Sequence, residues 1–222
     1  MKLAGKVVGI LGAGRSGIAA ARLALSEGAE VHVFDQAPSL REDVSGVMMH
    51  AAVDHNSADN MHFDLLIISP GIDPTQSWVQ AFAARARRFI GEMQFAWDFF
   101  RGKTVAITGT NGKTTTTELI STLLNAAGVH ALPCGNYGVP VSEIVMMSPQ
   151  PQAIALEASS FQLETIDRFC PDAVVWLNFA PDHMDRYPSV EAYRQAKLRI
   201  FANESDSMNC LLYTSPSPRD RG

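Results

Sequence analysis

The chain has 222 residues, a net charge of −5 and a hydrophobic fraction of 46%. This length predicts one or two globular domains with a substantial core. The negative charge and the absence of a clustered lysine and arginine face argue against a nucleic-acid partner. No apolar run approaches the roughly 18 residues that a membrane span requires. Because Cys134, Cys170 and Cys210 lack the spacing of a disulfide framework or metal site, we expect a reducing cytoplasm.

The chain opens with the pattern of a buried parallel strand and a glycine-rich loop. Residues 6–11 form a near-continuous apolar run, and Gly12 to Gly17 follow as G-x-G-x-x-G. After a helix over 18–27 and a strand over 31–34 comes Asp35, an acidic residue about 20 positions beyond the loop. Such a unit favours a diphosphate at a helix N-terminus, from NAD or from a UDP-linked ligand. A purely structural αβ turn is the alternative.

Further β/α units complete the first domain. A buried strand over 64–69 stops at Pro70-Gly71, at the edge where open parallel sheets bind ligands. A helical pattern covers 77–87, with a basic tract at 85–88 that we interpret as a solvated helix end. Because the β/α pattern restarts at Thr104, we expect a Rossmann-like domain over 1–93 and a second α/β domain over 94–209.

The strongest pattern in the chain lies between residues 105 and 117. A β-branched strand runs into a glycine loop that ends in Gly112-Lys113-Thr114. A helix follows, with one apolar face made of Leu119, Ile120, Leu123 and Leu124. This is the layout of a P-loop, in which backbone N–H groups hold phosphates, Lys113 adds charge and the Thr114 hydroxyl contacts Mg²⁺. The usual first glycine is replaced by Ile107, so a Gly/Thr-rich strand–turn–helix junction is the alternative.

Polar residues follow two later strands. Glu157 ends a strand over 153–156, where a carboxylate downstream of a P-loop can hold Mg²⁺. A strand over 173–177 precedes the run that contains His183, for which a loop histidine bonded to a neighbouring aspartate is the alternative. By spacing alone, Lys197 in a helix over 190–201 is a snorkelling surface residue, and residues 133–140 form an irregular connecting loop.

Together these motifs resemble the Mur ligases, the amide-forming enzymes of peptidoglycan precursor synthesis. The loop over 108–116 is common to several Mur ligases and to folylpolyglutamate synthases. The runs 157–164 and 182–188 resemble the branch that adds D-glutamate to UDP-N-acetylmuramoyl-L-alanine. The glycine loop at Gly12, residues 69–72 and Gly135-Asn136 fit it too, so the resemblance covers about residues 5–205.

The resemblance implies an ATP-dependent, Mg²⁺-dependent ligation through an acyl phosphate. It implies that Lys113, His183 and Lys197 are catalytic. Thr114 and Glu157 would hold one Mg²⁺, and His183 with a carbamylated Lys197 would serve a second. The implied ATP contacts are Gly109, Thr110, Asn111, Gly112, Lys113, Thr114 and Thr115.

For the first domain the resemblance implies a UDP site rather than an NAD site. The implied contacts with UDP-muramoyl-alanine are Arg15, Ser16, Asp35, Gln36 and Gly71, with Asn136 and Ser159 at the muramoyl end. We expect a cytoplasmic monomer that acts on small molecules, without a nucleic-acid or membrane partner.

The sequence departs from the family pattern in two ways. A third domain, which supplies the D-glutamate site and part of the ATP site, has no counterpart, and residues 210–222 are a Ser/Pro-rich tail expected to be disordered and non-native. We therefore expect little or no ligase activity from these 222 residues.

Four alternatives stay open. An NAD-dependent oxidoreductase leaves the P-loop unexplained, and a P-loop ATPase or GTPase switch leaves the first domain and His183 unexplained. Another Mur or folylpolyglutamate synthase-type ligase is opposed by the run 159–162. A non-enzymatic binding module is the last.

Overall fold

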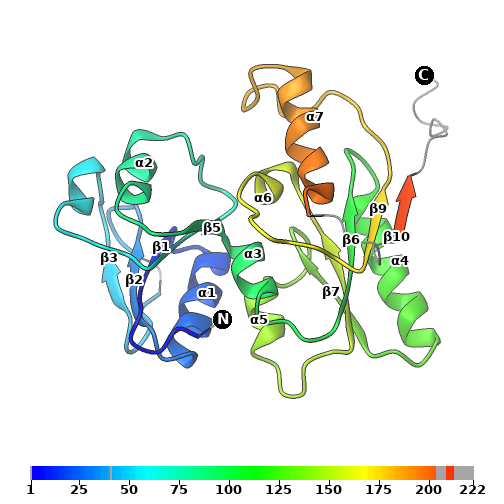
Figure 1. Cartoon of the computed structure of the whole chain (residues 1–222), viewed down its shortest axis with the longest axis horizontal. Coiled ribbons are helices and arrows are strands. Elements are labelled where there is room, and N and C mark those ends of the chain that lie inside the picture. The colour runs from blue at the N-terminus through cyan, green and yellow to red at the C-terminus, as the bar shows by residue number, and fades with distance from the viewer. Residues whose placement is uncertain (1, 41, 204–208, 213–222) are drawn as a thin grey trace. The chain divides into compact units, whose positions relative to one another are not determined.

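A computed structural model gives the fold of the chain and describes residues 2–40, 42–203 and 209–212. The chain divides into two compact units, each with one five-stranded sheet (Figure 1). Unit 1 contains Met1–Phe99 and Pro140–Met146, and unit 2 contains Phe100–Val139 and Met147–Gly222. Every strand pair in both sheets is parallel, which confirms the predicted α/β class.

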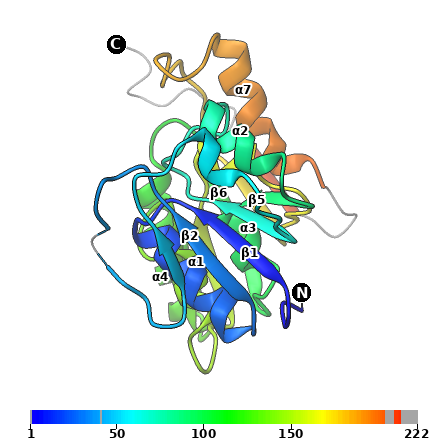
Figure 2. The same ribbon diagram turned by 90° about the vertical axis from the view of Figure 1, so that its left-hand side faces the viewer.

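The sheet of unit 1 has the strand order β3-β2-β1-β4-β5, which matches the first five strands of the Rossmann order 3-2-1-4-5-6. Its strands are β1 (Val7–Leu11), β2 (Glu30–Phe34), β3 (Met48–His50), β4 (Leu65–Ile68) and β5 (Phe89–Gly91). Its helices are α1 (Arg15–Ser26), η1 (His55–Ala58), α2 (Ser77–Ala83), α3 (Glu92–Trp97) and α5 (Val141–Val145). Helix α1 packs on β1 and β2 (Figure 2), because its alanine-rich face allows a close approach to the sheet.

The sheet of unit 2 has the order β10-β9-β6-β8-β7. Its strands are β6 (Lys103–Thr108), β7 (Ala131–Gly135), β8 (Ala153–Glu157), β9 (Ala173–Trp176) and β10 (Asn209–Leu212). Its helices are α4 (Lys113–Ala126), α6 (Ser160–Glu164), α7 (Val190–Leu198) and η2 (Arg199–Phe201). Because β8 and β9 flank β6, the carboxyl ends of all three strands meet beside the glycine loop.

The structure places the division between the units differently from the sequence prediction. Unit 1 runs to Phe99 rather than to residue 93, because α3 packs within it against α1 and α5. Helix α5 also joins unit 1, although it lies far along the chain between β7 and β8. Two of its residues are fixed there by hydrogen bonds: Ser142 bonds to Glu92 of α3, and Glu143 bonds to Arg15 of α1.

The predictions of a loop over residues 133–140 and of a helix end at residues 85–88 also need correction. Residues 133–135 belong to β7, the edge strand of the described sheet, where a proline is tolerated because its missing N–H need not face a neighbouring strand. Helix α2 ends at Ala83, so the basic tract at 85–88 leads into β5 and is not a helix end.

The expected disordered tail starts with a strand. Residues 210–212 belong to β10, which pairs in parallel with β9. The physical reason is that the outer edge of β9 offers unpaired backbone groups to an adjacent extended segment. The rest of the predicted tail, residues 213–222, lies outside the described residues.

Helix α4 buries only part of the predicted apolar face, because Ile120 and Leu124 are partly buried and the other two leucines are not. Thr117 and Ser121 are buried, whereas Leu119 and Leu123 are 54% and 58% exposed. The buried face packs on β7 and β8, and the Ser121 hydroxyl donates to the Ala131 carbonyl at 3.1 Å. No helix in the described part of the chain combines the length and apolar character needed to cross a bilayer.

Candidate functional site

The glycine loop of unit 2 joins β6 to α4, as the sequence predicts. Gly112 stands at the N-terminus of α4 with a φ of 81°, in the left-handed region that glycine adopts without strain. The Lys113 ammonium donates to the Thr110 carbonyl at 2.8 Å, so this side chain folds back over the loop. Thr115 is exposed at the start of the helix. The loop therefore presents a helix N-terminus and a cation together, an arrangement suited to phosphate.

Glu157 lies at the centre of the predicted magnesium site. Its carboxylate accepts one hydrogen bond from the Thr114 hydroxyl and one from the Asn136 side-chain amide, each 2.8 Å long. These bonds compensate for the burial of a residue that is only 2% exposed. A Cβ on Gly135 would lie 2.4 Å from the Glu157 carbonyl oxygen, so glycine is required where β7 meets β8. The structure thus brings together three predicted site residues from a helix, a strand and the loop after β7.

Thr114 and Glu157 together form a donor set that suits a hard cation. A hydroxyl oxygen and a carboxylate oxygen are ligands that Mg²⁺ accepts, usually together with waters and phosphate oxygens. The described residues contain no cluster of three or more histidine, cysteine, aspartate or glutamate side chains that could hold a metal by themselves. A cation at Glu157 would therefore depend on a phosphate ligand for part of its coordination.

Lys197 is buried beneath the glycine loop, so the interpretation as a snorkelling surface residue is wrong. It is 1% exposed, and its ammonium donates to the Gly109 carbonyl at 2.8 Å. Burial, with a smaller contribution from the nearby charge of Lys113, lowers the pKa of Lys197 to about 8, against the opposing effect of Asp182 and Glu157. The ammonium also lies 4.8 Å from the centre of the Tyr193 ring, a cation–π contact.

His183 lies in the exposed loop that follows β9. Its φ of 54° is uncommon for a residue with a side chain, and its backbone N–H donates to the Asp182 carboxylate at 2.8 Å. The imidazole Nε2 lies 3.6 Å from the same carboxylate, as the alternative interpretation of a bonded loop histidine anticipates. Its ring contacts two aromatic rings: the ring centroid of His183 lies 5.0 Å from that of Phe161 and 6.0 Å from that of Tyr193. Tyr193 thus contacts both His183 and Lys197.

Two residues of this site were missed by the sequence analysis. Tyr193 is 1% exposed, and its hydroxyl lies 3.4 Å from the Thr110 hydroxyl. Its position one helical turn before Lys197 was the available signal. Asn178 bonds to the glycine loop through its side chain. Its place two residues beyond the end of β9, at the same sheet edge as Glu157, was the signal for this contact.

Ser159 has a structural role in addition to any role at the muramoyl end. Its hydroxyl oxygen accepts a hydrogen bond from the Gln162 N–H, and the side-chain oxygen of Gln162 accepts one from the Ser159 N–H. This reciprocal pair is a capping box, and the S-x-x-Q spacing was its signal in the sequence. The side chain that was predicted to face substrate therefore also begins helix α6.

The glycine loop of unit 1 is fixed by Asp35. One carboxylate oxygen accepts from the Ala13 N–H at 2.7 Å, and the other accepts from the Ala37 N–H at 2.8 Å. A Cβ on Gly17 would lie 1.8 Å from the Gly12 carbonyl oxygen, so α1 can start here only with glycine. Asp35 therefore shapes the loop, whether or not it also contacts a ligand.

The remaining predicted contacts in unit 1 lie near this loop. The Arg15 guanidinium makes two hydrogen bonds with Glu143, of 3.1 and 3.2 Å, and this partner raises the pKa of Arg15. Gln36 and Gly71 are exposed, and Ser16 is half-buried at the start of α1. A hollow of about 260 Å³ adjoins the loop and is lined by Ala13, Gly14, Arg15, Ile18, Ala19, Arg22, Glu42 and Glu143.

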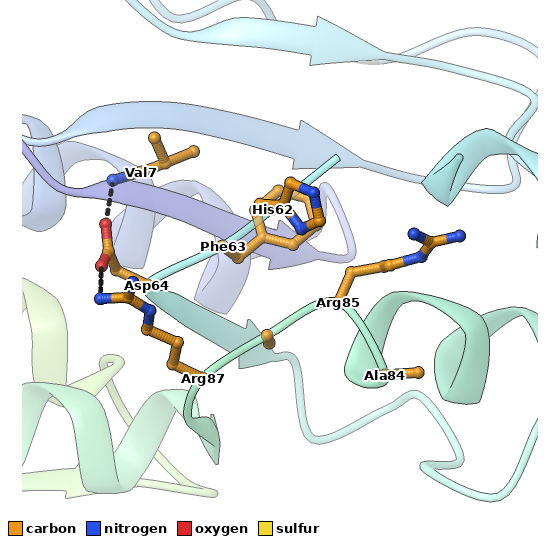
Figure 3. Close-up of a pocket in the computed structure, with 8 residues that line it drawn as sticks. Val7, His62, Phe63, Asp64, Ala84, Arg85 and Arg87 are labelled. Carbon is orange, nitrogen blue, oxygen red and sulfur yellow. Dashed lines mark hydrogen bonds and ion pairs between the residues drawn. The ribbon is translucent and has the colours of Figure 1, made fainter. Parts of the chain in front are cut away.

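A larger hollow of about 640 Å³ lies elsewhere in unit 1 (Figure 3). It opens beside the amino-terminal ends of β1 and β4, whereas parallel sheets bind ligands at the carboxyl ends of their strands. Asp64 accepts a hydrogen bond from the Val7 N–H and forms an ion pair with Arg87, and Arg85 pairs with Asp59. Because these charges already satisfy one another, we assign no ligand to this hollow.

Comparison with known proteins finds two matching families. The Mur ligase middle domain matches residues 107–216, and the N-terminal domain described as Mur ligase MurD-like matches residues 6–91. The first match extends into the segment 210–222 that the sequence analysis set apart from the family, which corrects that expectation. Together the two matches include both glycine loops.

Curated relatives align along nearly the whole chain. A UDP-N-acetylmuramoylalanine–D-glutamate ligase from Acidobacterium capsulatum is 43% identical over 92% of this chain and 46% of its own length. One from Lachnoclostridium phytofermentans is 35% identical over 96% of this chain and 48% of its own length. The chain thus spans about half the length of the curated relatives it matches.

Solved structures share the fold at low sequence identity. The UDP-N-acetylmuramate:L-alanyl-gamma-D-glutamyl-meso-diaminopimelate ligase from Neisseria meningitides has a TM-score of 0.62 at 19% identity, covering 96% of this chain and 73% of that one. The UDP-N-acetylmuramate-alanine ligase from Thermotoga maritima has a TM-score of 0.52 at 19% identity, covering 97% and 50%. At this identity the likeness concerns the fold alone.

Proposed function

The chain belongs to the Mur ligase family, and we propose that its two units bind the UDP-linked substrate and ATP of a ligase that adds D-glutamate to UDP-N-acetylmuramoyl-L-alanine. The observation that carries the proposal is the joining of Thr114, Glu157 and Asn136 beside the glycine loop. The alternatives fit less well. An oxidoreductase would not use this cluster of side chains, and a nucleotide switch would not use the MurD-like unit.

In the proposed reaction the alanyl carboxylate of the substrate attacks the γ-phosphorus of ATP, and ADP leaves. The amine of D-glutamate then attacks the acyl carbon, loses a proton and expels phosphate, which leaves an amide bond. Such transfers depend mainly on positioning and charge neutralisation. Lys113 supplies positive charge at the mouth of the loop, and the backbone N–H groups at the start of α4 hold phosphate oxygens.

One Mg²⁺ fits the residues present, held by the Thr114 hydroxyl and the Glu157 carboxylate. When bound there it supplies neutralising charge beside the phosphates. Asn136 bonds the other oxygen of Glu157 and so orients the carboxylate toward Thr114. We propose that Asn136 supports this ligand in addition to any contact with the muramoyl group.

A second cation does not fit the site with an unmodified Lys197. A lysine ammonium only donates hydrogen bonds, and this one donates to Gly109. Carbamylation would convert the side chain into an oxygen ligand. It requires a neutral amine, and a pKa of about 8 supplies one at mildly alkaline pH. We propose this modification for Lys197, with His183 as the second candidate ligand.

The proposed UDP site in unit 1 uses the glycine loop and the adjoining hollow. Asp35 holds the Ala13 amide in place, and the N-terminus of α1 faces the loop, which favours a diphosphate. Arg15 is half of an ion pair with Glu143 and can exchange that partner for a phosphate. The cytoplasmic location and the monomeric state remain predictions.

Ligand binding to the whole 222-residue chain tests the proposal. We expect calorimetric titrations to show binding of Mg²⁺·ADP and of UDP-N-acetylmuramoyl-L-alanine, with Lys113→Ala weakening only the first. NAD⁺ should give no signal. Binding of NAD⁺ without binding of the UDP compound would overturn the assignment. D-Glutamate-dependent phosphate release by this chain would contradict the expectation that these residues have little activity.

A further inference from the structure

The side-chain amide of Asn178 binds the glycine loop of unit 2 at two consecutive residues. Its Oδ1 accepts from the Thr110 N–H at 3.1 Å and from the Asn111 N–H at 2.9 Å, and its Nδ2 donates to the Asn111 carbonyl at 3.0 Å. We infer that Asn178 is a positioning residue that holds the loop in its phosphate-binding shape before nucleotide arrives. This inference rests on the proposed function.

The two peptide bonds whose N–H groups Asn178 holds are bonded on their other sides by lysines. Lys197 donates to the Gly109 carbonyl and Lys113 donates to the Thr110 carbonyl, each at 2.8 Å. Each peptide plane therefore has its N–H bonded to Asn178 and its C=O bonded to an ammonium group. A planar peptide that is held at both edges resists rotation, so Asn178 and the two lysines fix the loop together.

A second set of bonds joins the same two segments. The Thr110 hydroxyl accepts from the Ala180 N–H and donates to the Ala180 carbonyl, both at 3.0 Å. The Thr110 N–H also lies 3.3 Å from the Asn178 carbonyl oxygen. The stretch 178–180 therefore runs beside the loop and restrains Thr110 from both its backbone and its side chain.

Ordering this loop costs conformational entropy, and in a disordered loop that cost would reduce the binding free energy of the nucleotide. Gly109 and Gly112 both have positive φ, and glycines lose more backbone freedom on ordering than other residues. If the loop is already ordered, phosphate binding does not have to compensate for that lost entropy. Loss of Asn178 should therefore weaken binding of any ligand that uses the loop amides, whatever base it carries.

The chain supplies a matched control in Asn125, at the other end of α4. Its Nδ2 donates to the Ser121 and Ala131 carbonyls at 2.7 Å, and its Oδ1 accepts from the Ala131 N–H at 3.3 Å. Asn125 thus also bonds to the backbone through both ends of its side-chain amide in the same unit, away from the loop. Asn125→Ala and Asn178→Ala should lower the melting temperature by similar amounts.

The test measures loop order and ligand affinity separately. In the ligand-free chain, Asn178→Ala should speed hydrogen exchange at the Thr110 and Asn111 amides, and Asn125→Ala should not. By calorimetry, Asn178→Ala should weaken Mg²⁺·ADP and inorganic tripolyphosphate alike, by roughly 10- to 100-fold, while Asn125→Ala stays within about twofold. Thr110→Val removes only the hydroxyl bonds and should give a smaller loss of affinity for both ligands. It provides the test if Asn178→Ala does not fold.

The two possible failures can be told apart. Wild-type protein that binds neither ADP nor tripolyphosphate would overturn the proposed function, and this inference with it. Wild-type protein that binds both, with unchanged affinity and unchanged exchange in Asn178→Ala and Thr110→Val, would overturn the inference alone.

Discussion

The Thr114 hydroxyl donates a hydrogen bond of 2.8 Å to the Glu157 carboxylate across 43 residues of sequence. The first residue lies in the opening turn of the helix after the glycine loop, and the second ends a neighbouring strand. Because β6 and β8 pair in parallel, the two residues reach the same sheet edge. Sheet order, rather than proximity in the chain, thus assembles the proposed cation site.

Glu157→Gln tests this pair directly. Glutamine keeps the shape of the side chain but removes its charge, so it cannot neutralise a divalent cation. We expect the affinity for Mg²⁺·ADP to fall by at least about tenfold, while ADP measured in EDTA changes little. Calorimetry with and without magnesium separates the two results, and an equal loss in both conditions would contradict a metal role.

The buried amine of Lys197 should make stability depend on pH. Its pKa in the folded chain, about 8, lies below the value of 10.5 for an unperturbed lysine. Between these two pH values the unfolded chain binds more protons, so this group makes the folded state more stable as pH rises. The contribution should be roughly 1–2 kcal/mol between pH 8 and 9.5. Urea unfolding at both pH values should show a smaller rise for Lys197→Met than for wild type.

Gly17→Ala should strongly destabilise unit 1. The new Cβ would lie 1.8 Å from the Gly12 carbonyl oxygen, and a backbone atom cannot move away without disturbing the loop. We expect a loss of roughly 2–3 kcal/mol in the free energy of unfolding. Gly14→Ala is the control, because Gly14 has a φ of −76° and a Cβ added there would have no neighbouring atom within 4 Å. It should cost less than about 1 kcal/mol, the scale of an N-cap change from glycine to alanine.

Ser142→Ala should loosen helix α5 from unit 1. The Ser142 hydroxyl donates to the buried carboxyl of Glu92 at 2.6 Å, and the Ser142 N–H donates at 2.9 Å. Burial raises the pKa of Glu92, and these two bonds oppose that rise. Removing one should cost about 1.5–3 kcal/mol and raise that pKa further. The control is Ser26→Ala, which removes a hydroxyl bond to a neutral carbonyl. An equal loss in both variants would argue that the buried carboxyl of Glu92 adds nothing to the cost of removing a serine hydroxyl.

The exposed leucines of α4 provide a test of its orientation. Replacing Leu119 with Glu and Leu123 with Lys places an ion pair one turn apart on the exposed face. Stability should change by less than about 0.5 kcal/mol. Thr117→Lys places a charge on the buried face and should cost several times more. Thermal unfolding of the two variants compares the faces, and the opposite ranking would restore the orientation predicted from the leucine pattern.

The sequence alone was enough to predict the features whose residues are contiguous. Both glycine loops, the strands that precede them and the helices that follow were predicted, because each is a run of neighbouring residues with its own backbone preferences. Glu157 was found for the same reason, as a carboxylate at the end of a recognisable strand. The capping box at Ser159 was equally local, although its signal was not used.

Only the tertiary structure decided which distant residues meet. Lys197 was assigned to the surface by its spacing, yet it bonds to Gly109 across 88 residues. Asn178 reaches the loop because β9 lies next to β6, and α5 joins unit 1 through contacts with elements far away in the sequence. The leucine pattern predicted an apolar face of α4, but it did not determine which face of the helix packs on the sheet. These outcomes depend on strand order and packing, and local backbone preferences carry no information about either.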